Sequence, residues 1–145
     1  VGPIYGVIAF TLDVLKGYLP TVLAIQISSD PWLHVAVGMM SILGHSASIF
    51  LKFKGGKGAA TGLGMLLALS WKPALIVFVI VALLIAIGRV VSIATIFGCI
   101  LMPILLFVFE AQTEYVMVVS VICLFIIWRH RTNIKRLVEG KENKI

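Results

Sequence analysis

Long apolar runs, separated by short polar segments, restrict this chain to few folds. Residues 74–88 and 92–109 form two such runs, and neither contains a charged side chain. The 145 residues are 61% hydrophobic and 12% charged, which is about half the charged fraction of a soluble domain. A globule of this size cannot enclose so many apolar side chains. The composition therefore predicts an all-α polytopic integral membrane protein.

About six membrane-embedded helices are expected, at residues 4–27, 32–51, 59–71, 74–88, 92–109 and 115–128. The third covers only ~20 Å at ~1.5 Å per residue, less than the ~30 Å hydrocarbon core. It is expected to be tilted, re-entrant or half-buried, and to end at Lys72-Pro73. Trp32, Trp71 and Trp128 fall at predicted helix ends, as interfacial tryptophans tend to.

The basic residues predict an orientation in the membrane. Threading six passes from a cytoplasmic start leaves only Lys72 among the bases of the loops and tail on the outer side. The cytoplasmic side then holds Lys52, Lys54, Lys57, Arg89, Arg129, Arg131, Lys135, Arg136, Lys141 and Lys144. The net charge of +6 is thus concentrated at a membrane edge, which favours anionic lipids or a phosphorylated substrate over nucleic acid. Cys99 and Cys123 lie inside apolar runs without metal-ligand spacing. They are interpreted as small core residues, and neither a disulfide nor a zinc site is predicted.

A glycine-rich stretch interrupts the apolar pattern at residues 44–62 and predicts an anion site. Gly55, Gly56 and Gly58 allow backbone N–H groups to converge on one point, and a helix starting near Ala59 adds the positive end of its dipole. Lys57 supplies a charge, so phosphate is the favoured ligand. A nucleotide P-loop is excluded because a glycine, not a hydroxyl residue, follows the lysine. The alternative is that Gly58 and Gly62 only permit close helix packing.

Two further features lie near this stretch in the predicted topology. Asp13 and Lys16 are an oppositely charged pair on one helical face, and they form either a structural ion pair or the wall of a polar cavity. His45 is expected about two turns inside its span. It is either a hydrogen-bonded core residue or a donor that lines the cavity.

The basic tail contains a second set of polar residues. If the last helix continues through it, His130 and Asn133 share one face, with Arg136 a turn further on. Such a helix could position a hydroxyl or an oxyanion. The alternative is a solvated tail that binds lipid headgroups.

Several catalytic patterns are absent from the sequence. No histidine is followed five residues later by aspartate, and there is no Gly-x-Ser-x-Gly elbow. The tail carboxylates Glu139 and Glu142 are expected to be solvated or ion-paired, because basic residues surround them. Catalysis is therefore predicted to rest on positioning and charge and not on a His–Asp dyad.

Taken together, these motifs resemble the bacterial acyl-phosphate:glycerol-3-phosphate acyltransferase (PlsY) family over essentially the whole chain. The similar segments are Leu12-Asp13-x-x-Lys16-Gly17, Gly44-His45, Phe53-Lys54-Gly55-Gly56-Lys57-Gly58-Ala59-Ala60-Thr61, Arg89-Val-Val-Ser92 and His130-x-x-Asn133-Ile134-x-Arg136-Leu137-x-x-Gly140-x-Glu142. The resemblance implies a seven-helix enzyme of the inner membrane with a cytoplasmic active site. It would transfer a fatty acyl group from acyl phosphate to glycerol 3-phosphate in phospholipid synthesis. The products would be lysophosphatidic acid and phosphate, and neither acyl-CoA nor a metal or other cofactor would be needed.

The resemblance also assigns roles residue by residue. Residues 55–58 match the family's phosphate-binding loop, in which Lys57 belongs to the catalytic set, and Arg136 is expected to assist in binding phosphate. His130 and Asn133 match its activity-linked pair. Glu142 matches a structural glutamate. His45 and Ser92 match positions that line the active site, and Asp13 and Lys16 are expected to be structural.

The family's first motif, which carries a serine and an arginine needed for activity, is not found in the chain. It is expected to precede Val1, so residues 1–145 are interpreted as a single acyltransferase domain without its first helix. If this is the whole protein, we expect it to be inactive. A phosphate or organophosphate transporter is the alternative function and predicts inverted repeats, which the sequence does not show. A lipid-binding assembly factor is a third possibility.

Overall fold

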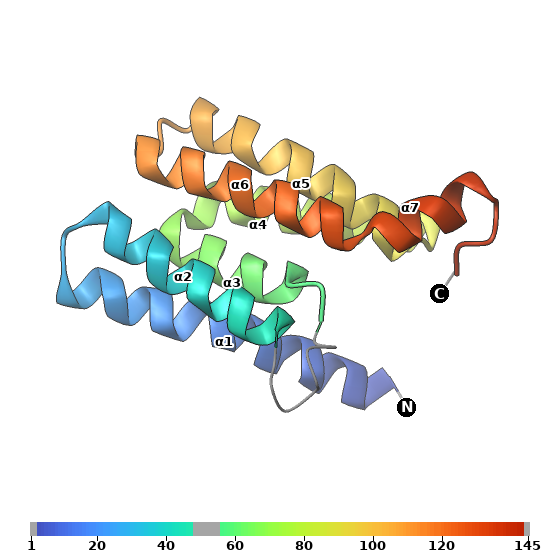
Figure 1. Cartoon of the computed structure of the whole chain (residues 1–145), viewed down its shortest axis with the longest axis horizontal. Helices are drawn as coiled ribbons and strands as arrows, with labels where there is room; N and C mark the ends of the chain where they lie inside the picture. Colours follow the sequence, from blue (N-terminus) through green and yellow to red (C-terminus); the bar gives the residue numbers. More distant parts are fainter. Residues whose placement is uncertain (1–2, 48–55, 144–145) are drawn as a thin grey trace. The chain divides into compact units, whose positions relative to one another are not determined.

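The computed structural model describes residues 3–47 and 56–143, and every regular element in these two ranges is an α-helix. This confirms the predicted helical class. The chain divides into two compact units, Val1–Trp71 and Lys72–Ile145. Figure 1 shows the helices α1 (Pro3–Ile27), α2 (Pro31–Ser46), α3 (Ala59–Leu69), α4 (Trp71–Gly88), α5 (Val91–Val108), α6 (Thr113–Arg129) and α7 (Arg131–Val138).

In the first unit, α1 and α2 form a hairpin around a three-residue turn. The Asp30 side chain accepts a hydrogen bond of 3.0 Å from the backbone N–H of Trp32 and so caps α2. Pro31 follows at the first helical position, where its missing N–H costs no hydrogen bond. His34 Nε2 lies 2.7 Å from the carbonyl oxygen of Ser28 and ties α2 back to the turn. The turn predicted at this point is confirmed.

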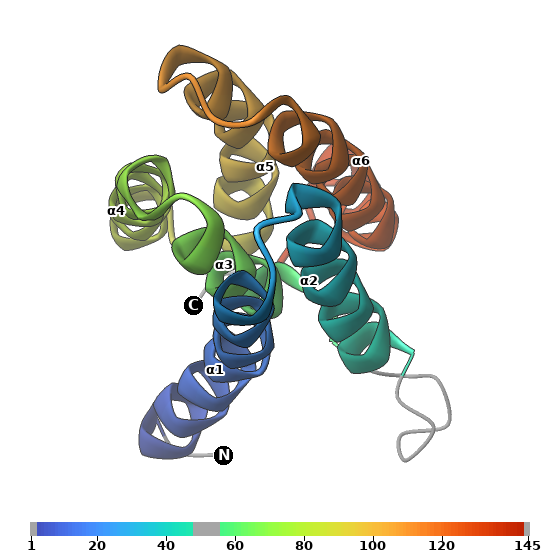
Figure 2. The ribbon, with the colours of Figure 1, turned by 90° about the vertical axis from the view of Figure 1, so that its left-hand side faces the viewer.

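The third helix, α3, packs against both α1 and α2 (Figure 2). The contact with α1 depends on two glycines that face the opposite backbone. A Cβ atom on Gly17 would lie 1.9 Å from the carbonyl oxygen of Thr61, and one on Gly64 would lie 1.9 Å from that of Val14. The Met65 side chain of α3 packs against Gly38 of α2, and Met65 is 1% exposed. Small residues at these positions let the backbones approach closely, as in many membrane helix pairs.

The second unit contains α4 to α7. Gly98 on α5 lies against Val81 of α4, where an added Cβ would come within 2.7 Å of a valine methyl carbon. Helices α5 and α6 pack along each other, and both bury a free cysteine, Cys99 and Cys123. Met102 and Leu106 complete the buried side of α5. The interpretation of the two cysteines as buried core residues is confirmed.

Two predicted helix boundaries are wrong. The break after α3 falls at Ser70 and not at Lys72-Pro73, because a proline in the first turn of α4 sacrifices no intrahelical hydrogen bond. Helix α2 ends at Ser46 and not at residue 51. Ala47 is its C-cap, with φ −108° and ψ 34°, which lies outside the helical range.

The predicted end of the last apolar helix is confirmed to within one residue, since α6 ends at Arg129. The tail does not continue α6, because the chain bends by 53° between α6 and α7. His130 lies at the bend, where its backbone N–H bonds to carbonyl oxygens of α6 and its own carbonyl oxygen accepts from Ile134 of α7.

By length and composition, three helices of the described ranges could cross a membrane: residues Ile4–Ile27 of α1, α4 and α5. The bent pair of α6 and α7 makes four if it counts as one span. Their outer faces expose apolar side chains such as Leu83 on α4 and Phe107 on α5. Six spans are not confirmed. Helix α3 has 11 residues, too few to cross the hydrocarbon core, as the sequence predicted.

Candidate functional site

The N-terminus of α3 is the centre of the first set of candidate residues. Gly58 is its N-cap with φ +86°, a left-handed conformation that glycine adopts without steric cost, and no side chain caps the helix there. An α-helix leaves its first N–H groups without partners inside the helix, and its dipole is positive at this end. Lys57 immediately precedes the cap. A lysine and the end of a helix that carries free N–H donors are therefore adjacent in the chain.

The last turn of α2 lies against the two described glycines of this loop. A Cβ atom on Gly56 would be 2.1 Å from His45 Nε2, and one on Gly58 would be 2.9 Å from a methyl carbon of Ile42. His45 is therefore in the final turn of α2 and not two turns inside it, because the helix ends earlier than predicted. Gly55 lies outside the described residues. Close packing accounts for Gly17 and Gly64, whereas Gly58 also has a backbone conformation that glycine favours.

His45 also contacts the predicted ion pair of α1. Lys16 Nζ lies 3.2 Å from Asp13 Oδ1, which confirms a pair, and His45 Nδ1 lies 3.4 Å from the same oxygen. A histidine and an aspartate are thus neighbours across α1 and α2, although no local motif links them in the sequence. Lys16 remains 62% exposed, whereas the His45 side chain is 15% exposed.

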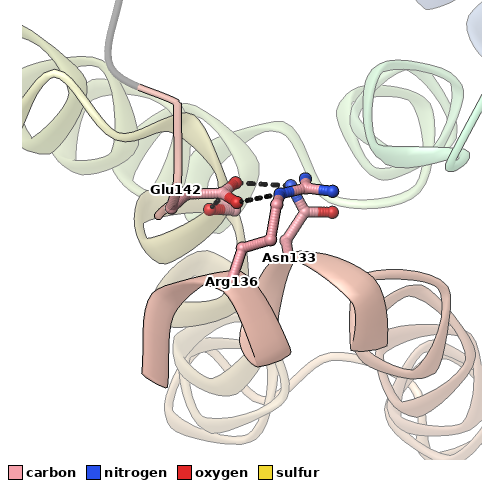
Figure 3. Close-up of polar contacts among 4 residues, drawn as sticks. Asn133, Arg136 and Glu142 are labelled. Atoms are coloured by element: carbon pink, nitrogen blue, oxygen red, sulfur yellow. Dashed lines mark hydrogen bonds and ion pairs between the residues drawn. The ribbon is translucent and has the colours of Figure 1, made fainter. Parts of the chain in front are cut away.

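Glu142 organises the second set of candidate residues, in the unit formed by α4 to α7 (Figure 3). Its carboxylate accepts hydrogen bonds from Asn133 Nδ2, from Arg136 Nε at 2.7 Å and from Ser92 Oγ at 2.8 Å. Only 7% of the Glu142 side chain is exposed, so it is buried and not solvated. The predicted ion pairing is confirmed for Glu142, and the predicted solvation holds only for Glu139, which pairs with Lys141 at the surface.

The same contacts lower the pKa of Glu142 from 4.5 to about 2. The main cause is the hydrogen bond from the Asn133 amide, followed by that from Arg136. Burial acts in the opposite direction. The carboxylate is therefore ionised at neutral pH and holds three donors from α5 and α7 in one arrangement.

His130 lies at the bend between α6 and α7 and is 4% exposed. Its Nδ1 is 2.8 Å from the carbonyl oxygen of Ile126, one turn earlier in α6. Asn133, in the first turn of α7, is 6% exposed. The bend thus fixes the direction in which α7 carries Asn133 and Arg136.

The structure groups the predicted residues into two clusters. Asp13, Lys16, His45, Gly56 and Gly58 form one in the first unit, with Lys57 between the two glycines. Ser92, Asn133, Arg136 and Glu142 form the other in the second unit.

Sequence reasoning missed the contact between His45 and Asp13, since no sequence signal marks it. It also missed two buried hydroxyls. Within the described ranges, Ser46 Oγ and Thr61 Oγ1 are buried without a hydrogen-bond partner. No group of three or more histidine, cysteine or acidic side chains in those ranges could hold a metal ion.

Comparison with known proteins identifies the family. A family model described as glycerol-3-phosphate acyltransferase matches residues 1–140. A glycerol-3-phosphate acyltransferase of Endomicrobium trichonymphae is 44% identical over the whole chain, which covers 73% of that protein. A glycerol-3-phosphate acyltransferase of Parasynechococcus marenigrum is 40% identical over 95% of the chain, and the chain covers 65% of that protein. The chain therefore spans 73% and 65% of the length of these two relatives.

Two solved structures are also similar. The crystal structure of PlsY (YgiH), an integral membrane glycerol 3-phosphate acyltransferase, in its lysophosphatidic acid form matches 99% of the chain with a TM-score of 0.95 and 39% identity. Its glycerol 3-phosphate form matches the whole chain equally well, and the chain covers 73% of it. Family model, relatives and structures agree. The chain belongs to the glycerol-3-phosphate acyltransferase family of integral membrane enzymes.

Proposed function

We propose that this chain supplies most of the active site of an enzyme that acylates glycerol 3-phosphate with acyl phosphate as the donor. Its relatives are named for this acceptor, and the PlsY structures are titled as its glycerol 3-phosphate and lysophosphatidic acid forms. The proposed products are lysophosphatidic acid and inorganic phosphate. Acyl phosphate is already activated, so the reaction needs no cofactor.

The observation that carries the proposal is the N-terminus of α3. Gly58 has a left-handed conformation there, with Lys57 before it and the first N–H groups of α3 after it. We assign residues 55–58 to binding a substrate phosphate, through backbone N–H groups and the charge of Lys57. Negative charge grows on the departing phosphate during acyl transfer. Contacts that strengthen with this charge stabilise the transition state more than the bound substrate and so accelerate the reaction.

The second cluster is assigned to the acceptor. Arg136 pairs with Glu142 through Nε while 42% of its side chain stays exposed, so the rest of the guanidinium group can bind a phosphate. His130 and Asn133 are proposed to orient the primary hydroxyl of glycerol 3-phosphate toward the acyl carbon, and Ser92 to hold Glu142. Alignment alone can supply ~7–11 kcal/mol of the activation free energy. The attacking hydroxyl gives its proton to a substrate phosphate oxygen, and the acyl–phosphate bond breaks as the ester bond forms.

The charge distribution supports a location for the reaction. The loop containing Lys57, the turn at Arg89 and the basic tail all belong to the side that the excess of lysine and arginine marks as cytoplasmic. We therefore assign the active site to the cytoplasmic face of the inner membrane. Membrane lipids would surround the exposed apolar faces of the helices and accept the product.

The test is acyl transfer by the full-length gene product reconstituted in lipid, with palmitoyl phosphate and radiolabelled glycerol 3-phosphate. We expect lysophosphatidic acid to form, and both Lys57→Ala and Asn133→Ala to reduce kcat/KM by about two orders of magnitude or more. Lys72→Ala, which removes a lysine assigned to the opposite face, is the matched control and should react as the wild type does. Normal turnover by both site variants would contradict the site. Transport of labelled phosphate without acylation would favour a transporter.

A further inference from the structure

The contact between Asp13 and His45 has no role in the reaction as proposed above, yet it links α1 to the end of α2. Asp13 Oδ1 lies 3.2 Å from Lys16 Nζ and 3.4 Å from His45 Nδ1. Lys16 is on the same helix, so its contact holds the carboxylate in place along α1. The contact with His45 then sets the orientation of the imidazole ring, because a carboxylate at Nδ1 fixes which way the opposite edge of the ring points.

That opposite edge lies against the glycine loop. A Cβ atom on Gly56 would come within 2.1 Å of His45 Nε2 and 2.9 Å of Cε1, distances at which something must move. The imidazole thus occupies the volume that any side chain at position 56 would need. The same turn of α2 also contacts the loop at Gly58, where a Cβ would lie 2.9 Å from Ile42 Cγ2 and 3.2 Å from Ser46 Oγ.

Lys57 is therefore flanked by two residues whose backbones rest on the last turn of α2. Gly58 is buried, and its φ of +86° leaves little freedom for the peptide that follows Lys57. Removing the imidazole would remove the contact of His45 with Gly56, one of the two residues that flank Lys57. Removing Asp13 would leave the ring in place but free to turn.

We propose that Asp13 and His45 are a positioning pair, which holds the backbone of residues 56–58, and with it Lys57, in the conformation that binds phosphate. The inference rests on the proposed phosphate-binding role of this loop. Neither residue of the pair touches substrate in this assignment. Asp13 acts on His45, and His45 acts on the loop.

A double-mutant cycle between Gly56 and His45 tests the pair in the full-length gene product. Gly56→Ala should lower kcat/KM by about 100-fold, because the new methyl group displaces the loop by about 1 Å, a shift of the size that costs this much in well-ordered active sites. In the presence of His45→Ala the methyl group has room, so adding Gly56→Ala should then cost much less than it does in the wild type. Most of the loss should appear in KM for the substrate that the loop binds.

Variants of Asp13 test whether the loop depends on the orientation of the His45 ring and not only on its volume. Asp13→Asn keeps an oxygen that can accept a hydrogen bond from the imidazole and should remain close to the wild type. Asp13→Leu should raise KM in the same direction as His45→Ala, because the ring is then free to turn. Gly6→Ala is the matched control, because it adds the same methyl group to α1 where nothing lies within 4 Å and outside the glycine loop. It should leave KM unchanged and should not lower the melting temperature.

Two results would contradict the proposed positioning pair. One is a double variant whose loss in kcat/KM equals the product of the losses caused by Gly56→Ala and His45→Ala alone. The other is an Asp13→Leu variant with unchanged KM. Either result in an active enzyme would leave the proposed function intact. A wild-type protein without acylation activity, or a Lys57→Ala variant with normal activity, would instead contradict the proposed function. A purely structural role would lower the melting temperature and the fraction of active enzyme without the selective rise in KM.

Discussion

The two clusters of candidate residues are held in place by opposite means. In the first unit, glycines bring backbone and ring atoms together, and a methyl group at Gly17, Gly56 or Gly64 would lie about 2 Å from its neighbour. In the second unit, a buried carboxylate gathers three hydrogen-bond donors from two helices. The first unit depends on glycine positions that carry no side chain, and the second cluster depends on polar side-chain atoms that form hydrogen bonds.

This difference predicts which kind of substitution each unit tolerates. Adding atoms should harm the first unit, because close-packed backbones cannot move apart without losing contacts along the whole helix pair. Removing hydrogen-bonding atoms should harm the second, because buried donors left without acceptors cost free energy.

Gly64→Ala should have the largest effect. Its methyl group would lie 1.9 Å from the carbonyl oxygen of Val14, which is backbone and cannot rotate away. Overpacking of this kind costs typically 1–3 kcal/mol and occasionally more. Thermal unfolding in detergent micelles should show a clearly lower melting temperature. The matched control is Gly6→Ala, which adds a methyl group to α1 with nothing within 4 Å. A Gly64→Ala variant as stable as this control would show that glycines do not set the helix contact.

The pH dependence of stability should reveal the carboxylate of the second cluster. Because the pKa of Glu142 falls from 4.5 to about 2 on folding, its stabilising contribution is complete above about pH 4.5. It is lost as the pH drops toward 2, where the folded protein finally takes up the proton. The melting temperature of the wild type should therefore fall over this window more steeply than that of Glu142→Gln. Parallel pH profiles for the two proteins would exclude a lowered pKa at this residue.

Lys141→Met should have the smallest effect, although it removes a charge directly beside Glu142. Lys141 Nζ lies 3.5 Å from Glu139 Oε2, and the two side chains are 74% and 40% exposed. Exposed pairs of this kind contribute ~0–1 kcal/mol. The melting temperature at neutral pH should stay close to that of the wild type. A loss as large as that of Glu142→Gln would mean that charge in general, and not the buried carboxylate, stabilises this cluster.

The sequence predicted the helices well but placed some of their ends incorrectly. Apolar periodicity and composition are properties of neighbouring residues, so the existence of the helices could be inferred directly. The ends of α2 at Ser46 and of α3 at Leu69 could not be inferred, because they depend on where the chain must go next. Pro73 looked like a helix break but lies inside the first turn of α4, where proline is tolerated.

The candidate residues were named from sequence, but their partners were not. The loop at residues 55–58 and the polar residues of α7 were recognisable from local motifs. The contact of His45 with Asp13 joins two helices, and the hydrogen bond from Ser92 to Glu142 spans 50 positions. Glu142 was expected to be solvated or ion-paired in the tail. It is ion-paired, and only 7% of its side chain is exposed, because the tail brings it to Ser92 of α5.

The sequence by itself determined that this chain is helical, that it belongs in a membrane, and that it carries a glycine loop with a lysine suited to phosphate. Those properties follow from the chemistry of adjacent residues. Only the tertiary structure decided that His45 supports Gly56, that Asp13 orients His45, and that Glu142 gathers Ser92, Asn133 and Arg136. These contacts arise where helices meet, and the way helices meet depends on packing over the whole interface, which no local pattern encodes.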